Sequence, residues 1–353
     1  MMPLMMPLAS HGLPLALTLG EPAGIGPDLT AAIWQRRSEL DLPPFYVVGD
    51  PDFLVRRASL LGLNLPVATV TPSQASAVFP QALPVVPLGL SVTAEPGCPD
   101  ASSAPAAIGS IRRAVADVLE GRAAAIVTNP IAKNVLYRSG FAEPGHTEFL
   151  ARLAEEARGL AGGTLHPVML LWSPELAVVP VTIHLPLREA VSRLTADLIF
   201  ETGQIVARDL KTHFGIANPR IAVAGLNPHA GEDGALGEED HTIVAPAVAR
   251  LRAAGVDAVG PLPADTMFHE AARATYDVAM GMYHDQALIP IKTLAFDHGV
   301  NVTLGLPFVR TSPDHGTAFD IAGTGKANVS SLVAALALAA RLTAAQKTPL
   351  IPA

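Results

Sequence analysis

Residues 15–37, LALTLGEPAGIGPDLTAAIWQRR, contain an apolar run, a glycine-rich turn and an amphipathic segment in succession. The run 15–19 predicts a buried strand, and the segment 27–37 predicts a helix with Pro27 in its first turn, where proline is well tolerated. The turn between them has neither the glycine spacing of a dinucleotide-binding fingerprint nor the lysine of a phosphate-binding loop. We therefore interpret it as a tight strand-to-helix connection, and whether it contacts a cofactor is not decided by its sequence. The same holds for a second glycine turn, at 323–325.

The alternation of strand and helix continues along the chain. Further strands are predicted at 45–48, 123–128, 168–171, 177–182, 220–224 and 278–282, and further helices at 108–120, after Thr147, within 194–212, around 245–254 and at 331–342. Residues 66–107 lack a helical period and are interpreted as a loop with an edge strand. Strands that alternate with helices predict an α/β fold with a mostly parallel sheet flanked by helices.

Length and composition limit the classes of protein. With 353 residues, 50% of them hydrophobic, the chain is expected to form about two domains. The net charge of -8 argues against nucleic acid or an anionic membrane as a partner. A single cysteine, Cys98, excludes an internal disulfide and suits a cytoplasmic location. Segment 1–8 has no basic residue and contains two prolines, so no signal peptide is expected, and no stretch is suited to span a bilayer.

Three histidines each follow a run of apolar or β-branched residues. They are His184 in VTIHLP, His229 in LNPHAGE and His284 in MYHDQ. Strand ends that lead into loops are where α/β proteins usually carry functional side chains. Three imidazoles would hold one divalent metal and leave coordination positions open, as in a catalytic site. Their spacing alone favours the simpler interpretation that the three are unrelated.

A second set of polar residues is suited to an anion. His146 and Thr147 open a predicted helix, so backbone N–H groups, a hydroxyl and an imidazole would converge there. An ordinary helix cap by Thr147 explains the same residues. Lys292, Asn301 and Arg310 interrupt apolar segments that we interpret as buried strands, where a polar group needs a partner. A phosphate would be one partner, and a structural salt bridge to an aspartate would be another.

Taken together, the motifs resemble those of the 4-hydroxythreonine-4-phosphate dehydrogenases, NAD-dependent enzymes of pyridoxal phosphate biosynthesis. The resemblance runs from GEPAGIGPD at 20–28 to DIAG at 320–323, and its most specific parts are PGHTEFL, GLNPHAGE, GPLPADT, YHDQALIPIK, VNVTLGLP and RTSPDHGTA. One departure is TNPIAK at 128–133, where other members often carry Gly and His. The resemblance implies an isocitrate/isopropylmalate dehydrogenase-like fold, with two α/β/α domains and a cleft between them. The domains would be 1–140 plus 300–353, and 141–299 with the dimer interface.

The resemblance also implies roles for individual residues. It places His184, His229 and His284 on the family's metal ligands, and His146, Thr147, Lys292, Asn301 and Arg310 on its substrate-binding residues. It implies a homodimer with the active site at the subunit interface, to which His284 would come from the partner of the subunit that supplies His184 and His229. NAD or NADP is the expected cofactor, and zinc, cobalt or magnesium the expected metal. Asp265 and Asp285 are candidates for the general base, and either could instead orient a ligand imidazole.

The implied reaction oxidises and decarboxylates 4-phosphohydroxy-L-threonine to 3-amino-2-oxopropyl phosphate. A metal on neutral imidazoles keeps its full charge and can polarise the substrate hydroxyl. One alternative is an enzyme of the same fold that acts on D-threonate or D-erythronate 4-phosphate, or on an aromatic cis-dihydrodiol carboxylate. A zinc hydrolase would use the same histidines but turn over without NAD. A non-catalytic phosphate-binding module would bind its ligand without a metal.

Overall fold

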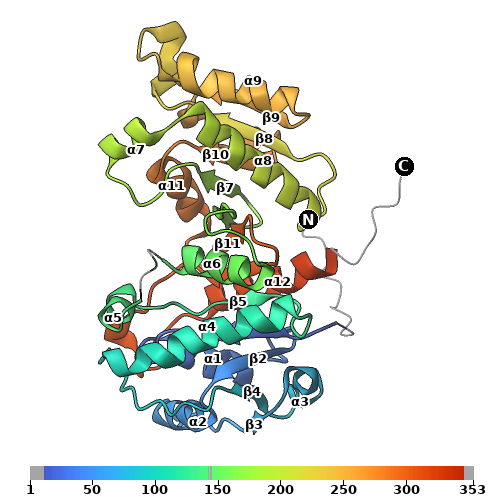
Figure 1. The fold of residues 1–353 in the computed structure, drawn as a ribbon, viewed down its shortest axis with the longest axis vertical. Helices are drawn as coiled ribbons and strands as arrows, with labels where there is room; N and C mark the ends of the chain where they lie inside the picture. Colours follow the sequence, from blue (N-terminus) through green and yellow to red (C-terminus); the bar gives the residue numbers. More distant parts are fainter. Residues whose placement is uncertain (1–11, 142, 144, 346–353) are drawn as a thin grey trace. The chain divides into compact units, whose positions relative to one another are not determined.

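The computed structural model describes residues 12–141, 143 and 145–345. Segment 1–8, considered above for export, lies outside the described residues. The chain divides into two compact units, which we call unit 1 (1–165 and 307–343) and unit 2 (166–306 and 344–353). The first break therefore falls at 165/166, later than the expected position near 140, because helix α6 (His146–Arg158) packs against α4 (Ala104–Leu119) of unit 1 (Figure 1).

Unit 1 contains parallel strands in the order β3-β4-β2-β1-β5-β12. They are β1 (Leu15–Thr18), β2 (Phe45–Gly49), β3 (Val67–Thr69), β4 (Leu83–Pro87), β5 (Ile126–Val127) and β12 (Arg310–Pro313). All residues of β1 and β2 are buried, as expected for interior strands of a parallel sheet. The predicted strand of 15–19 is thus confirmed.

The helices of unit 1 lie between these strands in the chain, except for the last one, which follows β12. They are α1 (Gly26–Gln35), α2 (Pro51–Leu60), α3 (Ala75–Val78), α4, α5 (Lys133–Arg138), α6 and α12 (Ser330–Ala345). Helix α1 has Pro27 in its first turn, as predicted. Segment 66–107 is more regular than the sequence indicated, because it contains β3, α3 and β4. Prolines 84 and 87 obscured β4, since proline is normally confined to edges and ends of strands.

Unit 2 contains a mixed sheet in the order β11-β6-β7-β10-β8-β9. Its strands are β6 (Val168–Trp172), β7 (Ala177–Pro180), β8 (Arg220–Ala224), β9 (Asp257–Leu262), β10 (Val278–Gly281) and β11 (Val300–Leu304). Strand β6 runs antiparallel to both β11 and β7, whereas β7, β10, β8 and β9 are parallel neighbours. The carboxyl ends of β7, β10 and β8 therefore lead into loops at one edge of this sheet.

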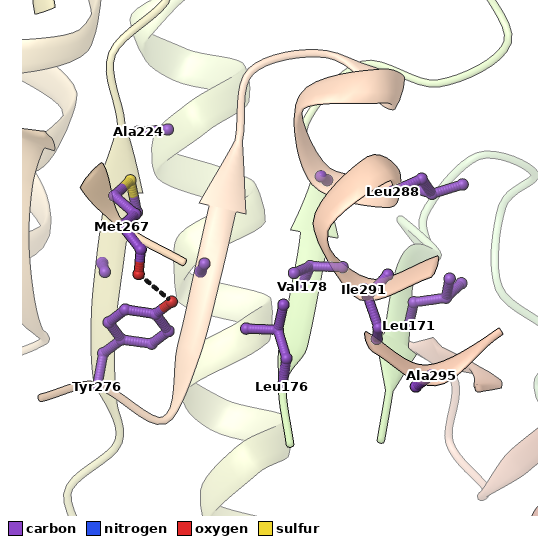
Figure 2. Packing of buried hydrophobic residues seen from close by; sticks show 12 residues of the cluster. Leu171, Leu176, Val178, Ala224, Met267, Tyr276, Leu288, Ile291 and Ala295 are labelled. Atoms are coloured by element: carbon purple, nitrogen blue, oxygen red, sulfur yellow. Dashed lines mark hydrogen bonds between the residues drawn. The ribbon is translucent and has the colours of Figure 1, made fainter. Parts of the chain in front are cut away.

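The helices of unit 2 are α7 (Leu187–Arg193), α8 (Ala196–Thr212), α9 (Ala245–Ala253), α10 (Glu270–Arg273) and α11 (His284–Ala295). The sequence did not indicate three of them, α7, α10 and α11. The interpretation of the segment before Lys292 as a buried strand is wrong, because α11 covers it despite Pro290. Figure 2 shows why: α11 packs on β7, and its Leu288 and Ile291 belong to the same buried cluster as Val178 of that strand. Within the described residues, no helix is long and apolar enough to cross a membrane.

Candidate functional site

Arg310 and Thr128 form a buried polar pair in unit 1. Arg310 begins β12 and is only 4% exposed, and Thr128 directly follows the neighbouring strand β5. The Nε and Nη2 groups of Arg310 donate to Thr128 Oγ1 at 3.1 and 2.6 Å. Burial lowers the pKa of Arg310 to about 10. An anion bound at this buried cation would favour its charged form and receive charge-assisted hydrogen bonds.

His146 lies near this pair at the start of α6. Burial, followed by the charges of Arg310 and Lys133, holds the pKa of His146 well below its usual value of 6.5. The imidazole is therefore neutral at pH 7, and its buried Nε2 has no hydrogen-bond partner among the described residues. The helix cap is Gly145 and no side chain caps the helix, so the alternative of an ordinary cap by Thr147 is wrong. Free N–H groups and the half-buried Thr147 thus remain for an anion.

Lys133 is a further cation at this place that the sequence did not indicate. It begins α5, and its Nζ lies 3.2 Å from where a Cβ would stand on Gly145, so the helix start lies beside the ammonium group. The available signal was its place in the motif TNPIAK, which begins with Thr128 and directly follows strand β5. We call Thr128, Lys133, His146, Thr147 and Arg310 the anion corner.

His184 and His284 lie side by side in unit 2. Their ring centroids are 5.7 Å apart, with 41° between the ring planes. Two imidazoles on one tetrahedral zinc, each bonded at about 2.0–2.1 Å, would have centroids roughly 5 Å apart. The histidines meet because β7 and β10 are neighbours, and because Thr182 donates through N and Oγ1 to Met282 O at 3.3 and 2.8 Å. The pair therefore fits two ligands of one metal ion.

Asp285 is engaged with one of these histidines. The Nδ1 atom of His284 lies 2.7 Å from Asp285 Oδ1, which leaves Nε2 for a metal. A carboxylate on the second ring nitrogen commonly orients a metal-binding imidazole and raises its basicity. Of the two roles considered for Asp285, this geometry favours orientation of His284 over proton abstraction.

His229 lies in the short turn η3 (Pro228–Gly234). Residues 229–233 all have left-handed backbone, with φ between 44° and 82°, and His184 has a φ of 52°. Such backbone costs on the order of 1–3 kcal/mol for a non-glycine residue and is concentrated at functional sites. Within the described part of the chain, no three metal-binding side chains are gathered. We expected the metal ligands to come from two subunits, with His184 and His229 from one and His284 from its partner. This division stays a prediction, and the contact of His284 with His184 in one chain argues against it.

The remaining candidates lie elsewhere in unit 2. Asp265 is exposed in the turn η5 (Ala264–Thr266), which lies next to η3. Lys292 lies in α11, with its Nζ 5.8 Å from the centre of the Phe296 ring. Asn301 lies in β11, opposite Leu171 of β6. The predicted substrate-binding residues therefore divide between the units, because His146, Thr147 and Arg310 belong to unit 1.

The two glycine turns that were left open for a cofactor are tied together in unit 1. Arg57 of α2 is buried, pairs with Asp28 Oδ1 at 2.5 Å and donates to Gly24 O at 2.6 Å. The other oxygen, Asp28 Oδ2, accepts from Gly323 N at 2.6 Å. One buried ion pair therefore holds both turns, a connection that the sequence did not indicate.

The fold and these two groups of residues define a two-unit α/β enzyme, with one group suited to an anion and another to a metal. The family model described as "Pyridoxal phosphate biosynthetic protein PdxA" matches residues 41–339. A 4-hydroxythreonine-4-phosphate dehydrogenase of Bradyrhizobium diazoefficiens is 66% identical over 348 residues, which are 96% of this chain and all of the relative. The chain therefore belongs to the PdxA family, as the resemblance predicted.

Two solved structures extend the comparison. The 4-hydroxythreonine-4-phosphate dehydrogenase of Klebsiella pneumoniae matches with a TM-score of 0.83 and 39% identity, over 94% of this chain and 100% of that one. A terephthalate 1,2-cis-dihydrodiol dehydrogenase of Burkholderia xenovorans matches with a TM-score of 0.63 and 27% identity, over 94% and 98%. These likenesses confirm the predicted α/β fold class.

Proposed function

We propose that this chain is an NAD- or NADP-dependent oxidoreductase that converts 4-phosphohydroxy-L-threonine to 3-amino-2-oxopropyl phosphate in pyridoxal phosphate biosynthesis. The high identity to a 4-hydroxythreonine-4-phosphate dehydrogenase supports this activity. The single structural observation that carries it is the buried Arg310 near His146, whose buried Nε2 has no partner among the described residues, because this arrangement is suited to a phosphate. A location in the reducing cytoplasm suits the exposed thiol of Cys98.

The anion corner would hold the phosphate far from the bonds that change. Arg310 and Lys133 would supply charge, and His146 Nε2, Thr147 and the N–H groups of α6 would donate hydrogen bonds. Lys292 and Asn301 are assigned to the substrate by resemblance alone. Binding energy at a non-reacting phosphate can orient the reacting carbon toward the nicotinamide.

His184 and His284 would hold the divalent metal, with Asp285 keeping His284 in the orientation that exposes Nε2. Imidazole ligands suit zinc or cobalt, and a chelating substrate would also admit magnesium. When bound, the metal would favour ionisation of the substrate hydroxyl and stabilise the negative charge left by loss of CO2. Asp265 is our candidate for the base that accepts the hydroxyl proton, since Asp285 already contacts His284.

His229 would complete the metal site in the assembled homodimer. The support is that one chain gathers His184 and His284 but no third ligand among the described residues. Mixing His229→Ala with His284→Ala subunits tests whether the ligands come from different chains. Random pairing would then restore roughly a quarter of the wild-type activity, since half of the dimers would contain one complete site out of two. No recovery would show that all three ligands belong to one chain.

The activity itself is tested with purified, metal-loaded protein and NAD. We expect NADH to form with 4-phosphohydroxy-L-threonine, and much more slowly with D-threonate and D-erythronate 4-phosphates. Rapid NADH formation with either of the latter only would contradict the proposed substrate and leave the family unaffected. Product formation without NAD would instead support the zinc hydrolase.

A second candidate substrate is an aromatic cis-dihydrodiol carboxylate. The similarity to the terephthalate dihydrodiol dehydrogenase supports it, and the cations of the anion corner would also bind a carboxylate. NADH formation with this diol and none with the phosphate esters would favour it over the main proposal.

A further inference from the structure

The side chain of Gln286 connects two of the turns that carry candidate metal histidines. Its Oε1 accepts from Met282 N at 2.6 Å, just before His284 in the chain. Its Nε2 donates to Gly225 O at 2.7 Å, just before the turn of His229. One half-buried amide therefore fixes the end of β10 against the end of β8.

Asp240 holds the turn of His229 from its other side. This carboxylate is only 2% exposed. Its Oδ1 accepts from Leu226 N at 2.6 Å, and its Oδ2 accepts from Asn227 N at 2.9 Å and from Asn227 Nδ2 at 3.1 Å. Three donors satisfy most of the hydrogen-bonding capacity of the buried group, so it is a firm anchor for the backbone before His229.

The turn of His229 also packs closely on this anchor. A Cβ on Gly225 would lie 2.8 Å from Ala230 Cα and 2.9 Å from Asp240 Oδ1. The left-handed residues 229–233 thus fold back onto Gly225 and Asp240. Strained backbone persists only where surrounding contacts hold it in place, and the contacts with Gly225 and Asp240 can hold the turn of His229 in this way.

His184 belongs to the same network through Met282. The carbonyl of Met282 accepts from Thr182, just before His184, and the N–H of Met282 donates to Gln286. Hydrogen bonds therefore connect the backbone before His184, His284 and His229 in succession. Neither Gln286 nor Asp240 belongs to the proposed set of metal ligands.

We propose that Gln286 and Asp240 are positioning residues that hold, in each chain, the turns of His184, His229 and His284 from which the metal sites of the homodimer would take their ligands. This inference rests on the metal site proposed above. The two side chains act through backbone groups and leave the ligand nitrogens to the metal. Loss of such outer contacts typically lowers metal affinity by about 10–100-fold.

Gln286→Glu tests the first positioning residue. The variant keeps the size of the side chain but places a carboxylate oxygen against Gly225 O, so that this hydrogen bond is replaced by repulsion. In titrations with cobalt chloride, we expect affinity to fall about 10–100-fold and the visible absorption of bound cobalt to change. Gln204→Glu makes the same chemical change on the exposed face of α8 and should leave both measurements unchanged.

Asp240→Asn tests the second positioning residue, and Asp209→Asn is the matched control. Asp209 is also 2% exposed, and it accepts from Gly305 N at 2.6 Å and Arg208 Nε at 2.7 Å, away from the histidine turns. We expect both variants to lower the melting temperature of metal-free protein, but only Asp240→Asn to weaken cobalt binding. Equal cobalt affinity in wild type, Gln286→Glu and Asp240→Asn would overturn the positioning role alone. Failure of the wild type to bind cobalt would overturn the metal site as well.

Discussion

The anion corner of unit 1 and the three histidines of unit 2 are built in opposite ways. Arg310 is 4% exposed and stands on a sheet strand, with its hydroxyl partner on the neighbouring strand. His184 and His229 are exposed on left-handed backbone, and no third ligand joins the pair of His184 and His284 in the described residues. Sheet pairing therefore preforms the Arg310–Thr128 pair, whereas the proposed metal site depends on turns that must be held in place. The proposed binding residues thus include a pair on regular strands, and two of the proposed metal ligands stand on strained backbone.

The largest effect is expected for His284→Ala. Removing one imidazole of the adjacent pair should lower kcat by about 10³-fold and abolish stoichiometric metal binding, because a preorganised electrostatic contribution is lost. Kinetics and metal analysis of the dialysed protein measure these losses. If the two regions are independent, the affinity for inorganic phosphate, measured by calorimetry, should stay unchanged. A parallel loss of phosphate affinity would show that the two regions are coupled.

Arg310→Lys should have the next largest effect, confined to the anion side. A lysine cannot reproduce the fork of donors that contacts Thr128, so we expect kcat/KM for the phosphorylated substrate to fall about 10²-fold. Metal content should match that of the wild type. Unchanged kcat/KM together with unchanged phosphate affinity would remove Arg310 from the substrate site.

Lys133→Met tests whether Lys133 contributes to the anion corner. Because Lys133 is exposed, solvent and salt screen its charge, and we expect KM for the substrate to rise by about 3–10-fold with little change in kcat. The increase should shrink as ionic strength is raised. Lys326→Met, at another exposed lysine of unit 1, is the control and should leave KM unchanged.

The smallest effect concerns stability, through His146. Its pKa is depressed in the folded protein, so the unfolded chain binds the additional proton as pH falls below about 6.5. The stabilisation from keeping His146 neutral is complete above that pH and is lost progressively toward the lower folded pKa. His146→Gln should flatten the pH dependence of the free energy of unfolding on the acid side of pH 6.5, measured by urea unfolding. Identical slopes in both proteins would show that His146 titrates normally.

The sequence predicted much of the fold because its signals are local. The apolar run at 15–19 and the helix after the glycine turn were found from periodicity and from Pro27. Strand β4 was missed because its prolines oppose a strand assignment, and α11 because its apolar residues and Pro290 conceal a helical period. Packing on the sheet of unit 2 overrides the cost of a proline in that helix.

In the candidate site, too, some residues could be found from local signals in the sequence and others could not. His146 and Arg310 could be nominated from residue chemistry and motif order, since imidazole and guanidinium groups at strand ends and helix starts are visible in a single sequence. Lys133 was missed although it stands in TNPIAK, because its position beside Gly145 depends on how α5 and α6 pack. The engagement of Asp285 with His284 likewise requires a side-chain geometry that no spacing specifies.

The alternation of strands and helices, the net negative charge, and the side-chain types available for an anion and a metal can all be read from the sequence alone. These properties follow from residue identity and short-range period. The sequence did not reveal that β12 lies beside β5, that β7 lies beside β10, or that Gln286 connects the segments before two of the histidines. The order of strands in a sheet depends on burial and hydrogen bonding between distant segments, and such contacts leave no local pattern in the chain.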